Sequence, residues 1–144
     1  MRKVNYDLIR EIWNCFSQQQ HVFLATSEGN QPRVRPVTLI QFRKHLYVAT
    51  GSDDAKVKQI EKNPKVEFCL IVEKGNQKGT LRAECISGIV GDRRIKANIF
   101  NEISFIKEFF KTPEDPKYAL LKFKPLSFEY MKPGELQAVK AKPE

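Results

Sequence analysis

The residues best suited to chemistry gather where an apolar segment runs into a helix-like one, in "HLYVATGSDDAKVKQIEKNP" at residues 45–64. Thr50 and Ser52 supply hydroxyls, and Lys56 supplies an ammonium group in the first turn of the expected helix. Backbone N–H groups at a helix start, together with hydroxyls and a cation, can hold a phosphate dianion. Because the helix dipole favours anions at this end, a lysine placed there indicates an anionic ligand.

Two arginines on the preceding strand-like segment could face the same ligand. Arg33 and Arg35 are two residues apart, so their side chains point to one face of a strand. On a buried face this pair would be costly unless it met an anion, whereas on an exposed face it would be unremarkable. If this strand and the next form a hairpin, Arg35 and Thr50 lie roughly one inter-strand spacing apart. The alternative is an ordinary strand-to-helix connection, capped by Asp53 or Asp54.

The elements that must position these groups are short strands and three amphipathic helices. Hydrophobic periodicity and turn residues predict helices at 6–18, 53–62 and 93–110, and strands at 21–26, 33–42, 46–50, 66–72, 80–90 and, as one or two strands, 118–132. Short turns join neighbouring strands, which favours antiparallel pairing. The pattern predicts one mainly β (α+β) domain over residues 1–144, either a closed barrel with flanking helices or a half-open sheet.

Composition narrows the possible classes of protein. The chain has 144 residues and a net charge of +8, but its 25 lysines and arginines are scattered and not interleaved with aromatic residues, so we expect no nucleic-acid binding. Three cysteines without a CxxC pair argue against disulfides and a metal site, and Cys69 and Cys85 are expected to be buried. No apolar run could span a bilayer and no secretion signal is recognisable, so we expect a cytoplasmic protein without membrane contacts.

In their order and spacing, five segments resemble the flavin-binding split-barrel family typified by pyridoxamine 5′-phosphate oxidase. They are "FLATSEGNQPRVRPV", "LYVATGS", "KVKQIEKNPKVEF", "LRAECISGIV" and "LKFKPLSFEYM", within residues 21–131. The resemblance implies a six-stranded antiparallel split β-barrel with flanking helices. It also implies a homodimer that binds FMN in two clefts at the subunit interface and acts on a small molecule.

The resemblance also assigns cofactor contacts to particular positions of this sequence. The implied FMN-binding residues are Arg35, Pro36, Val37, Thr38, Thr50, Ser52 and Lys56. Arg35 and Lys56 would pair with the phosphate, Thr50 would offer its hydroxyl, and the backbone of residues 36–38 would run along the isoalloxazine ring. Asp54 departs from the family pattern, because relatives often carry a small hydroxyl residue at its position.

Other departures bear on the reaction. The tail "MKPGELQAVKAKPE" lacks the Arg-His cluster that holds the substrate phosphate in true pyridoxamine 5′-phosphate oxidases, so that activity is not expected. The resemblance favours an FMN-dependent oxidoreductase of unknown substrate and assigns no catalytic residue. The alternatives are an F420-dependent reductase and a non-catalytic module that binds flavin or haem. Residues 93–116 replace a shorter connection and would form either a lid over the flavin or additional dimer surface.

Overall fold

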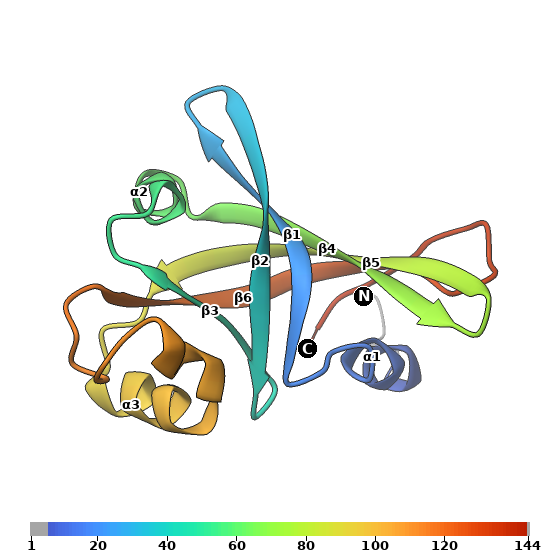
Figure 1. Ribbon diagram of the computed structural model, residues 1–144. Coiled ribbons are helices and arrows are strands. Elements are labelled where there is room, and N and C mark those ends of the chain that lie inside the picture. Colours follow the sequence, from blue (N-terminus) through green and yellow to red (C-terminus); the bar gives the residue numbers. More distant parts are fainter. Residues whose placement is uncertain (1–5, 144) are drawn as a thin grey trace.

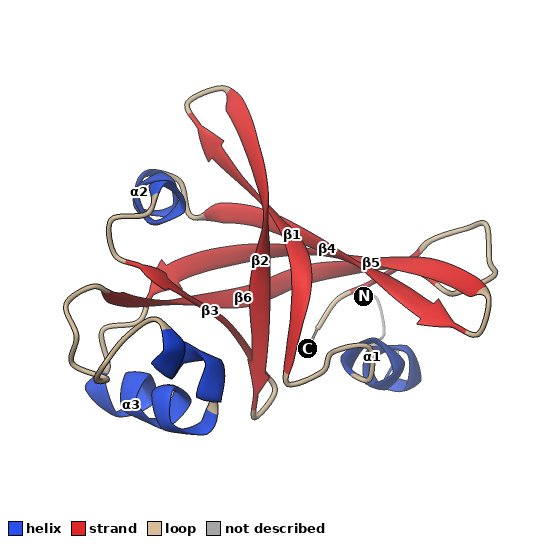
Figure 2. Cartoon of the chain, viewed as in Figure 1, coloured by secondary structure: helices blue, strands red, loops and turns tan. Residues whose placement is uncertain are grey.

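The computed structural model describes residues 6–143, arranged as strands wound around one core with helices outside (Figures 1 and 2). The elements in chain order are α1 (Tyr6–Trp13), β1 (Gln19–Glu28), β2 (Gln31–Phe42), β3 (His45–Gly51), α2 (Ala55–Lys62), β4 (Lys65–Lys74), β5 (Gln77–Ile89), α3 (Arg93–Glu102), the 3₁₀ helix η1 (Ser104–Glu108), β6 (Tyr118–Met131) and β7 (Val139–Ala141). The two-residue turn between β2 and β3 places Arg43 and Lys44 at positive φ, 53° and 61°, as a tight hairpin turn requires.

Antiparallel pairing closes the first six strands into a ring. The strand order is β3-β2-β1-β4-β5-β6-β7, and β3 also pairs with β6. The early part of β6 bonds to β3 and its later part to β7, while β5 pairs with it from Leu121 to Met131. The ends of β1 and β2 project from the ring as a two-stranded arm (Figure 1). The expected six-stranded antiparallel split barrel is therefore confirmed, with β7 as an unpredicted addition.

Strand alternation builds the core inside the ring. In β5, Leu81, Ala83 and Cys85 are buried, while Arg82 and Glu84 face outward. A second apolar cluster lies on the outer side of β3 and β6, where α3 and η1 pack. Cys69 is only partly buried, contrary to expectation, because the alternation of β4 turns its neighbours on both sides inward.

Two predicted helices are shorter in the structure. The first ends at Trp13, and a tight turn then carries Phe16 into the core, where its ring packs against Phe68 and Phe128. The third breaks at Ile103, whose backbone is extended (φ −106°, ψ 96°) before η1 begins. Ile103 and Ile106 are both buried on the two sides of this break. No helix among residues 6–143 is long and apolar enough to cross a membrane.

Candidate functional site

A cleft of about 270 Å³ opens where β2 and β3 separate. The pairing of these strands ends at Ile40 and Tyr47, and beyond that point β2 bonds to β1 and β3 bonds to β6. The separated strands supply two walls, formed by residues 36–38 and 48–51. β2 and β3 do form the expected hairpin, but their pairing ends before it reaches Arg35 and Thr50, so these two residues are not paired neighbours across it.

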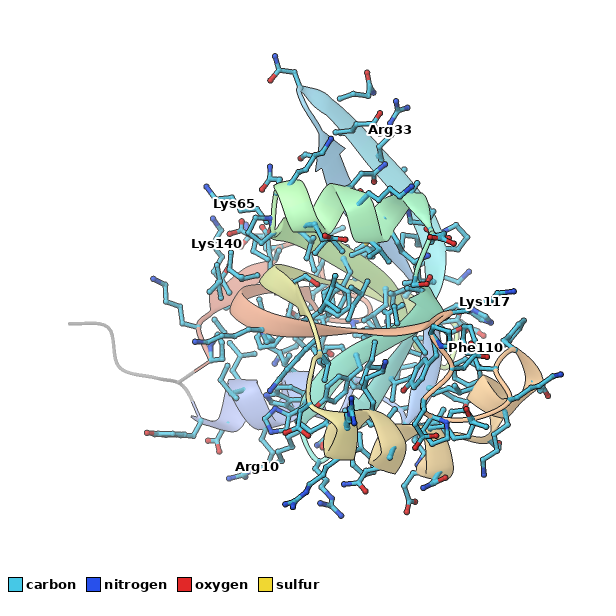
Figure 3. All side chains as sticks on the ribbon, turned by 90° about the vertical axis from the view of Figure 1, so that its left-hand side faces the viewer. Arg10, Arg33, Lys65, Phe110, Lys117 and Lys140 are labelled. Carbon is cyan, nitrogen blue, oxygen red and sulfur yellow. The ribbon has the colours of Figure 1, made fainter. Side chains whose placement is uncertain are left out.

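The third wall of the cleft is aromatic and comes from the segment that follows α3. Phe105, Ile106, Phe109 and Phe110 line it. Phe109 is 72% exposed, an unusual fraction for a phenylalanine, whereas Phe110 packs its ring against Tyr118. Figure 3 shows Phe110 beside Lys117, at the start of β6. The segment at residues 93–116 thus borders the cleft, as a lid would, and its role in a dimer stays a prediction.

The polar end of the cleft is formed by the first turn of α2. Lys56 is only 8% exposed, and its Nζ lies 2.9 Å from Oδ1 of Asp54. The same carboxylate oxygen accepts the backbone N–H of Lys56 and caps the helix. Burial opposes ionisation of Asp54, but the hydrogen bonds and charge of Lys56 and the charge of Arg35 outweigh it, so the pKa of this carboxyl is lowered. The structure thus contains both features that the sequence analysis set out as alternatives, a buried cation at Lys56 and an ordinary helix cap at Asp54.

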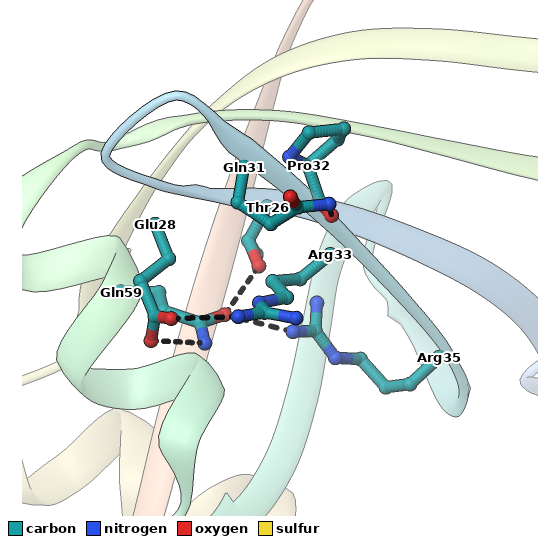
Figure 4. A network of polar contacts seen from close by, with 7 residues as sticks. All are labelled: Thr26, Glu28, Gln31, Pro32, Arg33, Arg35 and Gln59. Atoms are coloured by element: carbon teal, nitrogen blue, oxygen red, sulfur yellow. Dashed lines mark hydrogen bonds and ion pairs between the residues drawn. The ribbon is translucent and has the colours of Figure 1, made fainter.

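Arg35 lies next to this end but does not line the cleft. Its Nη2 donates to Oε1 of Gln59 at 2.8 Å (Figure 4). Its Nη1 donates to the backbone oxygen of Leu24 at 3.2 Å. Burial lowers the pKa of Arg35, partly opposed by the charge of Asp54. Because Gln59 also accepts the Thr26 hydroxyl at 2.6 Å, α2 and β1 together hold the arginine in place.

Arg33 has a different environment from Arg35. It lies on the projecting arm (Figure 3), where its guanidinium pairs with Glu28 at 2.9 Å and both side chains are about half exposed. This pairing and a hydrogen bond from the Gln59 amide lower the pKa of Glu28. The interpretation of Arg33 as an unremarkable exposed charge therefore applies, and only Arg35 is directed toward the interior.

Five of the seven predicted site residues line one cleft. They are Pro36, Val37, Thr38, Thr50 and Lys56. Arg35 is adjacent, while Ser52 is outside the lining and its backbone N–H bonds to the oxygen of Lys117. The sequence analysis missed Gln59 and the aromatic wall. Gln59 sits one helical turn after Lys56 among charged residues, and only packing of α2 on β1 reveals that it is buried.

The side chains around the cleft do not form a metal centre. Among the described residues, no three His, Cys, Asp or Glu side chains are grouped so that they could hold an ion. Lys56 is the only titratable side chain in the described lining. The cleft therefore offers a largely apolar space with a cationic end, which can bind and orient an anionic molecule with an apolar body.

The ring of six strands, the outer helices and the cleft between separated strands define a split-barrel protein. A family model of pyridoxamine 5′-phosphate oxidase matches residues 8–132. The chain therefore belongs to the pyridoxamine 5′-phosphate oxidase family. No curated protein gives a significant match to the sequence.

Solved structures show the same fold. General Stress Protein 26 from Bacillus anthracis is 26% identical over 90% of this chain and 98% of its own, with a TM-score of 0.72. A NimC/NimA family protein from Clostridium acetobutylicum is 21% identical over 94% and 90%, with a TM-score of 0.74. A haem-binding protein from Mycobacterium smegmatis is 10% identical, and the match covers 99% of this chain and 59% of that one, with a TM-score of 0.74.

Proposed function

We propose that this protein binds FMN in the cleft between β2 and β3 and acts as an oxidoreductase on a small molecule. The observation that carries the proposal is the joining of a largely apolar space to a buried lysine in one cleft. The isoalloxazine ring matches the first part in polarity, and the phosphate matches the second in charge. Membership of the pyridoxamine 5′-phosphate oxidase family supports the same assignment.

The donor groups present fit an FMN phosphate. Lys56 and Arg35 carry two positive charges at this end of the cleft, whereas the backbone N–H groups of Asp54, Lys56 and Val57 are already bonded within the turn. Thr50 is 8% exposed and lines the cleft, so its hydroxyl is placed to bond to a ligand. Asp54 opposes the fit, because its carboxylate already forms an ion pair with the Lys56 ammonium.

The size of the cleft supports the proposed homodimer. At about 270 Å³ it falls below the range of about 300–1,000 Å³ that is usual for pockets enclosing ligands of this size. A second copy of the chain placed against its open side would enclose the ring. We therefore include a dimer with FMN at the subunit interface in the proposal, to be tested by sedimentation equilibrium.

The chain's contribution would be binding and orientation. FMN, when bound, supplies hydride and electron transfer, for which the protein needs no acid or base of its own. Backbone groups of Val37 and Thr38 would orient the ring, and the wall formed by Phe105, Phe109 and Phe110 would exclude water from it. No catalytic residue is proposed.

Haem is a weaker candidate for this cleft. One structural neighbour is a haem-binding protein. However, the described lining includes no His, Cys, Met or Tyr side chain that could ligate haem iron. F420 remains the cofactor to compare with FMN, because its longer anionic tail would also suit a chain of net charge +8.

The test is a visible absorption spectrum of the purified protein after incubation with FMN and removal of free ligand. Oxidised-flavin bands retained in proportion to protein support the proposal, and their bleaching by NAD(P)H supports turnover. Lys56→Ala and Arg35→Ala should each weaken FMN roughly tenfold or more, since a charge-assisted hydrogen bond contributes about 1.5–3 kcal/mol. Two results would overturn the assignment. One is retention of F420 but not FMN, and the other is an FMN affinity in both variants equal to that of the native protein.

A further inference from the structure

A second and larger cavity lies away from the cofactor cleft and shares no lining residue with it. Its volume is about 650 Å³, and it is bounded by the start of β3, the end of β5, the middle of β6 and the loop that enters α3. We call it the lysine pocket after the lysines at its edge, Lys44, Lys122 and Lys124.

The charges around the lysine pocket are predominantly positive. None of its three lysines has a carboxylate within ion-pair distance among residues 6–143. The sole carboxylate of the lining is Asp92, and its Oδ1 accepts the backbone N–H groups of Arg94 and Ile95 at 2.8 and 3.4 Å. These cations therefore lack internal partners, unlike Lys56, which has Asp54.

The walls of the pocket are apolar. They are formed by Leu46, Ile86, Ile89, Val90, Ile95, Phe123 and Pro125. Ile89 is 46% exposed, so it presents apolar surface to whatever enters. A Cβ at Gly88 or Gly91 would meet no atom within 4 Å, so the backbone is open to a ligand at both positions.

One buried polar group in the lining has no partner. Ser87 is 3% exposed, and its hydroxyl is the one buried side-chain polar atom among the described residues that makes no hydrogen bond. Buried hydroxyls are normally hydrogen-bonded, because leaving one unpaired is costly. Ser87 shares the inward face of β5 with Ala83 and Cys85 and pairs with buried Phe123, so its hydroxyl faces the core and not the lysines.

We propose that the lysine pocket binds a small amphiphilic organic anion. The carboxylate, sulfonate or phosphate of the ligand lies among the lysines, and its apolar body lies against the aliphatic walls. A single strand of nucleic acid fits less well, because it needs exposed aromatic side chains for stacking. Among phenylalanine, tyrosine and tryptophan, the lining contains only Phe123, which is 1% exposed.

The test uses two probes with the full chain. Anilinonaphthalenesulfonate, an aromatic anion that fluoresces in apolar surroundings, is titrated to measure affinity and stoichiometry. Decanoate and decanol then compete for the site, which separates the charge of the ligand from its apolar body. We expect one saturable site per chain that decanoate empties and decanol does not, with affinity falling as salt rises.

Variants locate the site. K122Q/K124Q should weaken the probe roughly tenfold, since it removes two charge-assisted contacts, and G88W should abolish binding by filling open space. The control, K74Q/K78Q, makes the same change of charge on the β4–β5 hairpin and should bind normally. Circular dichroism confirms folding of each variant.

Three results would overturn the proposal. The first is unchanged affinity in both K122Q/K124Q and G88W, and the second is the absence of any saturable site. The third is loss of probe binding in F109A, which lines the cofactor cleft, with no loss in the lysine-pocket variants.

Discussion

Replacing Asp54 by serine tests how the phosphate end of the cleft is controlled. Asp54 caps α2 and holds the Lys56 ammonium at 2.9 Å, so an incoming phosphate must compete with this carboxylate. Serine caps helices about as well as aspartate does, so the substitution removes the charge while leaving α2 in place. We expect Asp54→Ser to bind FMN more tightly than the native protein.

The magnitude follows from the exposure of the two side chains. Asp54 is 44% exposed and Lys56 only 9%, which places the pair between aqueous and buried conditions. Two unit charges 4 Å apart interact by about 1 kcal/mol in water and about 4 kcal/mol at an effective dielectric constant of 20. After allowance for screening at the exposed carboxylate, we expect a gain of about 1–2 kcal/mol, or a factor of about 5–30 in affinity.

The assay is quenching of flavin fluorescence, measured with FMN and with riboflavin. Riboflavin lacks the phosphate, so its affinity should stay within about twofold while FMN improves. Because its pKa is lowered, Asp54 stays ionised in the native protein over the whole range from about pH 5 to 7, so only the phosphate changes its charge there. The advantage of the variant should therefore grow between about pH 5 and 7, as the phosphate loses its second proton near pH 6.

Two outcomes would contradict this account. Equal improvement for riboflavin would mean that Asp54 acts through the shape of the cleft and not through charge. Weaker FMN binding in Asp54→Ser, with unchanged thermal stability, would mean that Asp54 positions Lys56 for the phosphate instead of competing with it.

Three further predictions concern side chains around the barrel. Gln59→Leu leaves Thr26 and Arg35 without their acceptor, so urea unfolding should show a loss of about 1–3 kcal/mol, and an unchanged midpoint would contradict the network. Phe109→Ala should leave the melting temperature unchanged because the side chain is 72% exposed, yet weaken FMN and riboflavin alike; equal affinity would remove Phe109 from the site. Burial raises the pKa of Cys85 to about 12. A thiol reagent at pH 8 should therefore modify Cys69 first and Cys85 only after unfolding, and labelling of Cys85 in the folded protein would refute its burial.

Local signals in the sequence predicted much of the fold and part of the site. The hydroxyl of Thr50 and the charge of Lys56 sit in one strand-to-helix turn, so their closeness follows from short-range geometry. The partner of Arg35 could not be predicted, because Gln59 reaches it only through packing of α2 on β1. The break at Ile103 also depends on tertiary structure, since a continuous helix satisfies the local periodicity equally well.

The positive charge shows the same limit of sequence analysis. Lys44 and Lys122 are far apart in the chain and looked like scattered surface charge. Pairing of β3 with β6 sets Tyr47 opposite Lys122, which brings the two lysines to one cavity. A basic cluster of this kind is a property of strand register, and the sequence alone does not fix the register between distant strands.

The closure of the ring by β3 and β6 has a consequence for folding kinetics. This pairing joins distant parts of the chain, such as Leu46 with Phe123, so its loop-closure entropy makes it a slow step. Because β3 forms one wall of the cofactor cleft, the cleft is complete only when the ring has closed. A ligand bound there stabilises the native state by mass action but has no site on the open chain. It should therefore slow unfolding while leaving the rate of refolding unchanged.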